Sequence, residues 1–487
     1  MVAFTRKQLE AKDKDELIDI ILSLQSMVES LASMVVTLEA KVASLEKEVV
    51  SLEKEVGRLK KPTTSRNSSL PPSKDLTGGR YPKGGSGNKG KSGRKSGGQL
   101  GHRGSTLEMS ATPDIVRDHF PGLDCPGCSK VFGPSDFRVL ERRQVVDIPP
   151  IEAIVTEHRA YGARCGCGYC HKGTFPFTVK APVQYGNNLC SLVCYLSTRQ
   201  FIPMARLTEL LEGIAGITMS QGTVANMLDR SARLLDPLYS GIRDAVAASG
   251  VVGGDETGLS VNGRKRWAWT WQTAGATYIS HSRSRGHDTV RENFPGGFPG
   301  AVYVSDSLGA QFKTPAKAHQ LCLAHITREL ALFVEKDKSR WAGQVREILF
   351  SAMELKKRMR DIDYHRCPER DGILQRFHEL VSRPVEHETK KEHALQKRLI
   401  KYRHEIFTFL FDPGVPPDNN ASERAIRNIK VKQKVSGEFR SDRGADIFAV
   451  FRSIVDTVLK RGGKPLPALT LALNVAAWKK DFMASYG

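Results

Sequence analysis

The stretch Val251-Val252-Gly253-Gly254-Asp255-Glu256-Thr257 decides how this sequence is interpreted, because it is an apolar run that ends in acids. Its apolar residues predict a buried strand. The dipeptide Asn262-Gly263 follows and is suited to a tight hairpin turn, since both residues tolerate positive φ. Residues 267–271 alternate with a period of two, and residues 277–280 form a third short segment of this kind. Three consecutive antiparallel strands are therefore expected.

Two further acids lie in segments with structural signals of their own. A helix-length polar stretch at 288–293 leads to a second apolar run, 300–306, which ends in Asp306. Glu423 lies in Asp418-Asn419-Asn420-Ala421-Ser422-Glu423, which is typical of a capped helix start. Three strands, a helix, a strand with an acid at its tip and a later helix with a glutamate form the element order of an RNase H-like nuclease core.

Carboxylates in this arrangement are suited to metal-dependent phosphodiester chemistry. Two divalent ions about 4 Å apart can activate an attacking oxygen and stabilise the leaving oxygen of an in-line phosphoryl transfer. Mg²⁺ prefers oxygen ligands and keeps several waters, so three carboxylates and the substrate phosphates suffice. We expect Asp255, Asp306 and Glu423 to be catalytic and to bind two Mg²⁺ ions, with Mn²⁺ as a substitute. A solvated charged face would explain Glu423 alone, but not the strand context of both aspartates.

Basic residues accompany Glu423 along the predicted helix. Arg427 follows it by four residues and Lys430 by seven, so the three side chains share one face. DNA phosphates would lie beside the two cations. The residues predicted to bind DNA are Arg427, Lys430, Lys432 and Lys434.

Several sequence blocks occur in a fixed order along the chain. Besides two pairs of cysteines, they are Asn67-Ser68-Ser69-Leu70-Pro71-Pro72-Ser73-Lys74-Asp75, Gly97-Gly98-Gln99-Leu100-Gly101-His102-Arg103-Gly104, Asp255-Glu256-Thr257, Cys322-Leu323-Ala324-His325 and Asp418-Asn419-Asn420-Ala421-Ser422-Glu423-Arg424. In this combination the chain resembles the DDE transposases of the insertion sequence 66 family over most of its length beyond residue 60. The resemblance implies that Asp255, Asp306 and Glu423 are the catalytic triad of a transposase, and that a mainly helical insertion separates Asp306 from Glu423.

The charge balance favours a polyanionic partner. The 487 residues include 73 Lys and Arg against 53 Asp and Glu, a net charge of +20. Residues 60–104 hold eleven basic residues and one acid, and 11 − 1 = +10 is half of that total. This Gly/Ser/Pro-rich segment predicts a flexible basic linker that binds nucleic acid without sequence preference. No signal peptide or transmembrane run is recognised, so we expect a cytoplasmic, nucleoid-associated protein of a prokaryote.

The first 60 residues carry a seven-residue repeat. Leucines recur at every seventh position, and a β-branched residue follows four positions after each of the first six; the two series are Leu17, Leu24, Leu31, Leu38, Leu45, Leu52, Leu59 and Ile21, Val28, Val35, Val42, Val49, Val56. Leucine at d with β-branched residues at a favours a parallel two-stranded coiled coil, and so a homodimer. A single amphipathic helix packed on the protein's own core is the alternative, which six uninterrupted heptads disfavour.

Clustered cysteines predict a structural zinc ion. Two CxxC pairs flank segments 145–148 and 153–156, which resemble a β-hairpin, as in a zinc ribbon. We expect Cys125, Cys128, Cys167 and Cys170 to bind Zn²⁺; Cys165 in place of Cys167 stays open, and His171 is a less favoured donor. Two disulfides are the alternative, against which a cytoplasmic location argues.

Residues 206–213 and a helix from Ser220, joined by Gly216-Ile217-Thr218, have the spacing of a helix-turn-helix, although a helical bundle that bridges two domains explains them equally well. Trp267, Trp269 and Trp271 share one strand face, which we expect to be buried under helices. The Cys322-x-x-His325 pair is interpreted as structural or near DNA, and only weakly as a metal site.

The chain is thus expected to be a multidomain α/β protein. Its predicted parts are a coiled coil (1–60), a basic linker (61–110), a zinc ribbon (111–180), a helical DNA-binding segment (181–248), the first part of an RNase H-like core (249–320), a helical insertion (321–415) and the C-terminal helices of the core (416–487). The predicted function is that of a DDE transposase that binds element ends and target DNA, with the need for accessory transposition proteins left open. The alternatives are a catalytically silent DNA-binding relative and a nuclease of the same fold.

Overall fold

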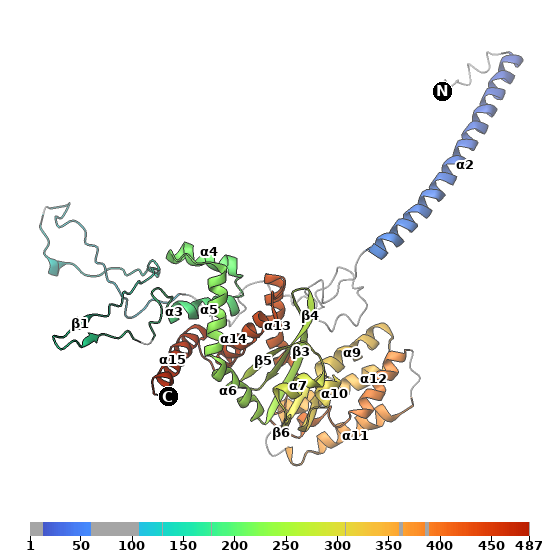
Figure 1. Cartoon of the computed structure of the whole chain (residues 1–487). Coiled ribbons are helices and arrows are strands. Elements are labelled where there is room, and N and C mark those ends of the chain that lie inside the picture. The colour runs from blue at the N-terminus through green and yellow to red at the C-terminus, as the bar shows by residue number, and fades with distance from the viewer. Residues whose placement is uncertain are drawn as a thin grey trace. The chain divides into compact units, whose positions relative to one another are not determined.

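The computed structural model describes residues 13–59, 107–128, 130–176, 178–306, 308–359, 364–384 and 389–486 (Figure 1). Of residues 47, 51–59 and 478–486 within these ranges, it describes the backbone alone. The chain divides into two compact units, residues 1–105 and 106–487. Most of the predicted basic linker, up to residue 106, lies outside the described residues.

The first unit is described as one helix, α2 (Lys14–Leu59). It begins beside Asp13, whose carboxylate accepts the backbone N–H of Glu16 at 2.9 Å. Between Ile21 and Val49 the side chains of the heptad stripe are solvent-exposed in a single chain; Val28 and Leu38, for example, are 63% and 60% exposed. The segment Lys14–Val50 is also long and apolar enough to cross a membrane, by length and composition only. A helix that pairs through an apolar coiled-coil stripe can have the same length and composition.

Residues 107–185 contain little regular structure. They hold a 3₁₀ turn, η2 (Pro134–Asp136), and one antiparallel pair of short strands, β1 (Gly162–Arg164) and β2 (Cys170–Lys172). The hairpin predicted at 145–148 and 153–156 is wrong: neither segment is a strand, and Val145 and Ile154 are more than 90% exposed. β-Branched residues favour a strand only where another strand or a core covers them, and here nothing in the described chain does.

Four helices precede the sheet: α3 (Asn187–Thr198), α4 (Met204–Ala215), α5 (Gln221–Leu234) and α6 (Asp236–Ala247). Helix α4 ends at Gly216, whose φ of +63° needs a glycine, and α5 begins at Ser220, whose hydroxyl accepts the N–H of Thr223 at 3.1 Å. The two predicted helices and the turn between them are therefore present, as both the helix-turn-helix and the helical-bundle interpretations expect. Its buried residues, including Leu207 and Val224, belong to the core that also contains the sheet tryptophans.

The centre of the second unit is a mixed five-stranded sheet, as predicted for an α/β protein. Its strands are β3 (Val251–Val261), β4 (Arg264–Gln272), β5 (Thr277–Ser282), β6 (Phe298–Ser305) and β7 (Ala316–Leu321), in the order β5-β4-β3-β6-β7. Strands β3, β4 and β5 are antiparallel neighbours, and β6 and β7 run parallel to β3. Asn262 and Gly263 make the β3–β4 turn with φ of +45° and +70°, as the dipeptide predicted. Helix α7 (His287–Asn293) connects β5 to β6.

One face of the sheet carries the aromatic core. Trp269 and Trp271 are fully buried and stacked with their ring centroids 5.7 Å apart, which confirms the predicted buried face for these two. Trp267 is only half-buried, and the cations of Lys265 and Arg285 lie 4.7 and 5.0 Å from the centre of its ring.

The opposite face is covered by two C-terminal helices, α13 (Asn420–Ser436) and α14 (Asp442–Lys460). Helix α14 also follows the edge strand β5, where the hydroxyls of Ser453 and Thr457 accept the N–H groups of Ile279 and Thr277 at 2.9 and 3.0 Å. A sheet edge that would otherwise expose N–H donors is closed in this way. The last helix is α15 (Pro465–Tyr486).

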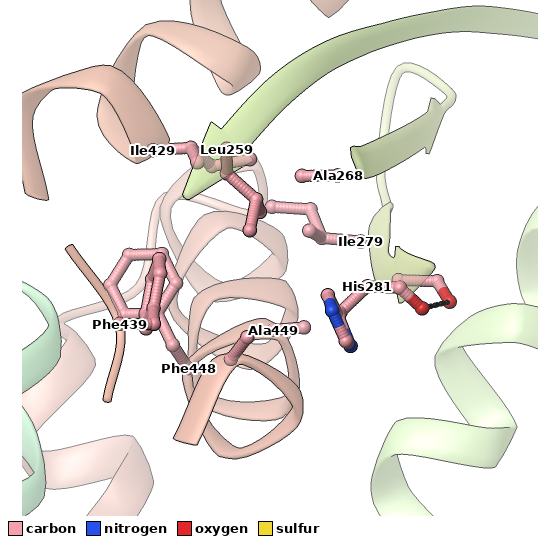
Figure 2. A pocket seen from close by; sticks show the side chains of 10 residues that line it. Leu259, Ala268, Ile279, His281, Ile429, Phe439, Phe448 and Ala449 are labelled. Atoms are coloured by element: carbon pink, nitrogen blue, oxygen red, sulfur yellow. Dashed lines mark hydrogen bonds between the residues drawn. The ribbon is translucent and has the colours of Figure 1, made fainter. Parts of the chain in front are cut away.

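A small cavity lies between this face and the two helices, lined by apolar residues such as Leu259, Ile429 and Phe448 and by His281 (Figure 2). Its free volume of about 10 Å³ is at the lower limit for one water molecule. The cavity is therefore a packing gap and cannot accommodate a substrate.

The stretch between the second and third predicted acids is mainly helical, as expected. After the short helix α8 (Gly309–Phe312) and β7, it contains α9 (Leu323–Lys336), α10 (Arg340–Arg358), α11 (Pro368–Ser382), α12 (Lys390–Lys401) and the 3₁₀ turn η4 (Thr408–Leu410). These helices gather at one end of the sheet and share a core with Val302, Val304 and Leu321 of β6 and β7 (Figure 1).

Candidate active site

Strand register brings the two aspartates together. Val251 pairs with Val302 and Gly253 with Val304 in the parallel β3–β6 ladder, so two residues further the ladder would set Asp255 opposite Asp306. β6 ends at Ser305, so Asp306 lies just past its carboxyl end. Because residues two apart on a strand face the same side, both carboxylates belong to the face covered by α13.

Helix α13 brings the third acid to the same place. The side-chain amide of Asn419 donates to the carbonyl oxygen of Gly254 at 2.6 Å, and the hydroxyl of Ser422 donates to Oδ1 of Asn419 at 2.5 Å. Both side chains are buried, so Asn419 ties the helix start to β3 instead of capping it. Glu423, in the first turn of α13, is thereby near enough to Asp255 for its charge to raise the pKa of Asp255.

A glycine at position 253 makes this approach possible. A Cβ atom there would lie 2.6 Å from Nε2 of Gln272, 2.7 Å from Oγ of Ser422 and 2.9 Å from Oδ1 of Asn419. Contacts this short do not occur in folded proteins, so any side chain would push α13 away from β3. Gly253 therefore serves the geometry of the site and not only that of the strand.

The acids act on one another electrostatically. Burial raises the pKa of Asp255 well above its usual range, and the negative charges of Glu256, Asp306 and Glu423 raise it further. A cation bound among these carboxylates would relieve both effects. The residues present therefore fit the divalent metal that the carboxylate pattern predicted.

Glu256 is an additional acid at the site that the sequence interpretation did not single out. Its side chain is 1% exposed and projects to the other face of β3. Oε1 accepts the Nε and Nη2 groups of Arg285 at 3.0 and 2.6 Å, and Oε2 accepts Nε2 of Gln311 at 2.7 Å. Burial, followed by the charge of Asp306, raises the pKa of Glu256 to about 7 even with these donors present. In the sequence, only its position next to Asp255 indicates a role for Glu256 at the site.

Helix α9 contributes a second set of groups around Glu423. Nη2 of Arg328 lies 3.2 Å from Oε1 of Glu423, and Nε2 of His325 lies 3.8 Å from the same oxygen. Cys322, directly before α9, is buried, and its Sγ accepts the N–H of Asn419 at 3.2 Å. Burial raises the pKa of the Cys322 thiol to about 11 and lowers that of His325, which Arg328 lowers further. The sequence interpretation did not include Arg328, and it did not place the Cys322–His325 pair beside Glu423.

The four basic residues predicted to bind DNA differ in availability. Arg427 is 72% exposed and its Nη2 lies 4.0 Å from Oε2 of Glu423, and Lys434 is also exposed. Lys430 donates to the carbonyl oxygen of Gly258 at 2.5 Å, and burial lowers the pKa of Lys430 and of Lys432. Arg427 and Lys434 thus present exposed charges, whereas Lys430 is engaged with the sheet.

The predicted zinc ligands form two local loops. Backbone bonds from Cys125 N to Lys130 O (2.9 Å) and from Cys165 N to Tyr169 O (2.8 Å) close them. Backbone N–H donors lower the pKa of the Cys125 and Cys165 thiols, an environment that favours thiolate. Among the described residues, however, no three of the five cysteines bring their sulfur atoms within 4.8 Å of one another; the group that meets this distance is Cys322, His325 and Glu423.

Comparison with known proteins identifies relatives of two parts of the chain. Residues 182–447, more than half of its length, match a model described as "Transposase IS66 family", and this range contains all three acids. Residues 10–108 match a family of unknown function, DUF6444. The uncharacterized protein y4jD of Sinorhizobium fredii (strain NBRC 101917 / NGR234) is 27% identical over 365 residues, which cover 66% of this chain and 69% of that protein.

Proposed function

Because the chain belongs to the IS66 family of transposases, we propose that it binds the ends of a mobile DNA element and catalyses their cleavage and joining to target DNA by a metal-dependent DDE mechanism. The observation that carries this proposal is the convergence of Asp255, Asp306 and Glu423. They come from the interior of β3, the end of β6 and the start of α13, which lie far apart in sequence, and the charges of Asp306 and Glu423 both raise the pKa of Asp255. Mutual approach of acids is electrostatically unfavourable without a cation, which makes a metal site the simplest explanation.

The catalytic core is proposed to be RNase H-like. The strand order, in which three consecutive antiparallel strands precede two parallel strands, supports it, as does the acid at the tip of β6. The helical stretch 321–415 would then be an insertion in that core, and residues 416–487 its last helices.

Asp255 and Asp306 would hold two Mg²⁺ ions, and Glu423 would hold one of them. When bound, the ions would supply activation of the attacking oxygen and stabilisation of the leaving oxygen. The chain's own contribution is to fix the acids: the Asn419–Gly254 hydrogen bond holds the helix of Glu423, and Arg328 orients its carboxylate. The exposed guanidinium of Arg427 would neutralise a phosphate beside the metal site.

The remaining parts of the chain would assemble the complex. The α2 stripe would pair two chains in parallel, so that two DNA ends are held together. The segment around Cys125, Cys128, Cys167 and Cys170 would form a zinc ribbon, which requires the two cysteine loops to come together. The lowered pKa of the Cys165 thiol supports Cys165 as an alternative to Cys167. The linker 61–110 would bind phosphates without sequence preference, helices α4 and α5 would offer a DNA-binding pair, and the protein would act in the cytoplasm.

The proposal is tested with the purified full-length protein and DNA that carries the element ends. Asp255→Asn, Asp306→Asn and Glu423→Gln are each expected to abolish Mg²⁺-dependent cleavage and strand transfer, while DNA binding in a mobility-shift assay stays within about twofold, since phosphate contacts dominate affinity. Asp288→Asn, which changes an exposed acid of α7, is the matched control and should cleave normally. Cleavage without joining would indicate a nuclease, and binding without cleavage a catalytically silent relative.

A further inference from the structure

We propose that Cys322, His325 and Glu423 form a binding site for a thiophilic divalent cation of the Zn²⁺ type, distinct from the ribbon cysteines, and that its occupation withdraws Glu423 from the catalytic metal site. The second half of this inference rests on the proposed function; the first half does not.

The three side chains meet although they come from separate elements. Cys322 directly precedes α9, His325 lies in its first turn and Glu423 lies in the first turn of α13. One potential ligand atom from each residue lies within 4.8 Å of the others. Donor atoms on one tetrahedral zinc are roughly 3.5 Å apart, given metal–ligand distances of about 2.0–2.3 Å. Side-chain movements of about 1 Å would therefore close the site.

The donor set suits zinc better than magnesium. A sulfur, an imidazole nitrogen and a carboxylate oxygen with one open position are the ligands of open zinc sites, whereas Mg²⁺ takes oxygen ligands. Asp255 and Asp306 offer only oxygens, so the two neighbouring sites would differ in metal preference. Glu423 is the one residue that both would use.

The surroundings of the two non-acidic donors support a ligand role. The sulfur of Cys322 accepts the backbone N–H of Asn419 at 3.2 Å, and N–H groups of Ala324 and His325 also act on it. Such donors stabilise a thiolate once a metal has displaced the proton. Nδ1 of His325 is buried and has no hydrogen-bond partner in the described chain, and Nε2 at 3.8 Å from Glu423 is beyond hydrogen-bond range. An imidazole left without a partner beside a thiol and a carboxylate is available to bind a cation.

Arg328 opposes zinc binding at this site. Its guanidinium lies 3.2 Å from Glu423 and competes with any cation for that carboxylate. Zinc binding would have to displace this contact, and Glu423 would then turn toward Cys322 and away from the two aspartates. Occupation is therefore expected to inhibit Mg²⁺-dependent cleavage.

The binding test counts zinc ions on the full-length protein by titration against a chromophoric chelator. Wild type should bind one more equivalent per chain than Cys322→Ser and His325→Ala, whatever the ribbon cysteines contribute. Cys367→Ser is the matched control, because Cys367 is also a buried cysteine directly before a helix whose sulfur accepts a backbone N–H, from Arg370 at 3.5 Å. Serine can accept the same N–H groups, and His325 is partly exposed, so both test variants are expected to fold; melting curves check this.

The functional test adds Zn²⁺ to cleavage reactions at fixed Mg²⁺. The zinc concentration for half-inhibition should rise at least about tenfold in His325→Ala and stay unchanged in Cys367→Ser. A loss of about tenfold in metal affinity is already the lower end for residues that only support a metal ligand. Equal zinc counts in wild type, Cys322→Ser and His325→Ala would overturn the site itself. A wild type that binds the extra zinc but cleaves no DNA under any condition would instead overturn the proposed function and leave the site standing.

Discussion

The side-chain amide of Asn419 donates a hydrogen bond of 2.6 Å to the carbonyl oxygen of Gly254, and so joins the helix of Glu423 to the strand of Asp255. The bond is buried, and Asn419 also accepts from Ser422 and donates its backbone N–H to Cys322. One residue thus connects β3, α13 and the start of α9. The position of Glu423 relative to Asp255 therefore depends on Asn419.

Asn419→Ala is expected to destabilise the protein and to slow cleavage. It leaves the carbonyl group of Gly254 and the hydroxyl of Ser422 buried without this partner, at a cost of about 1–3 kcal/mol. Cleavage should fall more than DNA binding, because the linker 61–110, which is proposed to bind phosphates, is not part of α13. Urea unfolding and cleavage of labelled element ends measure the two effects. Asn420→Ala, one residue further along, is the control; equal losses in both variants would show that the link has no special role.

Gly253→Ala is expected to displace α13 and to reduce cleavage sharply. Its Cβ would lie 2.9 Å or less from three side-chain atoms, and overpacking of a well-packed region costs about 1–3 kcal/mol. Gly258→Ala is a matched control in the same strand, because a Cβ there would meet its nearest atoms at 3.9 Å. Thermal melting and cleavage rates compare the two. Similar behaviour of both variants would contradict the view that close approach of α13 requires a glycine at 253.

Local patterns were enough to single out the three acids as candidates, but not to predict their surroundings. Asp255 and Asp306 each follow apolar strand residues, and Glu423 follows helix-start residues. In each case the acid and the residues that predict its secondary structure lie in one short segment. Arg328 reaches Glu423 across 95 residues of sequence, and no local pattern indicates which arginine of a helical insertion will do so.

Strand β7 was missed for a related reason. It reads Ala-Lys-Ala-His-Gln-Leu, without the alternation of a half-buried strand. Its Gln320 is fully buried because long-range partners satisfy it: its amide donates to the carbonyl of Ile406 at 3.0 Å and its oxygen accepts the N–H of Phe409 at 2.8 Å. The sequence segment alone gives no sign of these partners. The hairpin expected at 145–156 is the reverse case, in which β-forming residues find no partner strand.

Mg²⁺ is expected to stabilise the protein against heat, and more so at pH 8 than at pH 6. The pKa of Glu256 is raised to about 7 and that of Asp255 is raised well above its usual range, so the folded state binds protons more tightly than the unfolded state. Without metal, stability therefore falls as pH rises from the ordinary range of a carboxyl group through about 7. Mg²⁺ held by deprotonated Asp255 and Asp306 would compensate the negative charge that raises the pKa of Glu256, and so offset that loss. Melting temperatures with and without Mg²⁺ test this, and an equal gain in Asp255→Asn would place the ion elsewhere.

Freshly purified, reduced protein is expected to contain about one tightly bound Zn²⁺ per chain at the ribbon cysteines, held by four thiolates as structural zinc usually is. Cys125→Ser and Cys170→Ser should each lose it. The comparison of Cys165→Ser with Cys167→Ser identifies the fourth ligand, since only one of them should lose the ion. Metal analysis by mass spectrometry provides the count. Protein that holds no zinc before any is added would exclude the ribbon.

The α2 helix is expected to dimerise without help from the rest of the chain. Between Leu24 and Val49 its heptad side chains are about half exposed or more in one chain, and burying such a side chain fully gains on the order of 1.5–3 kcal/mol. Val35→Asp with Leu38→Asp would place unpaired like charges in the middle of the stripe, a cost that flanking contacts cannot offset. This double variant should sediment as a monomer that still binds single DNA ends but fails to pair them. Val36→Asp with Ala40→Asp adds the same charge off the stripe and should stay dimeric. A stable dimer of the Val35→Asp, Leu38→Asp variant would show that other surfaces join the chains. Loss of the dimer in both double variants would show that net charge, rather than the a and d positions, governs assembly.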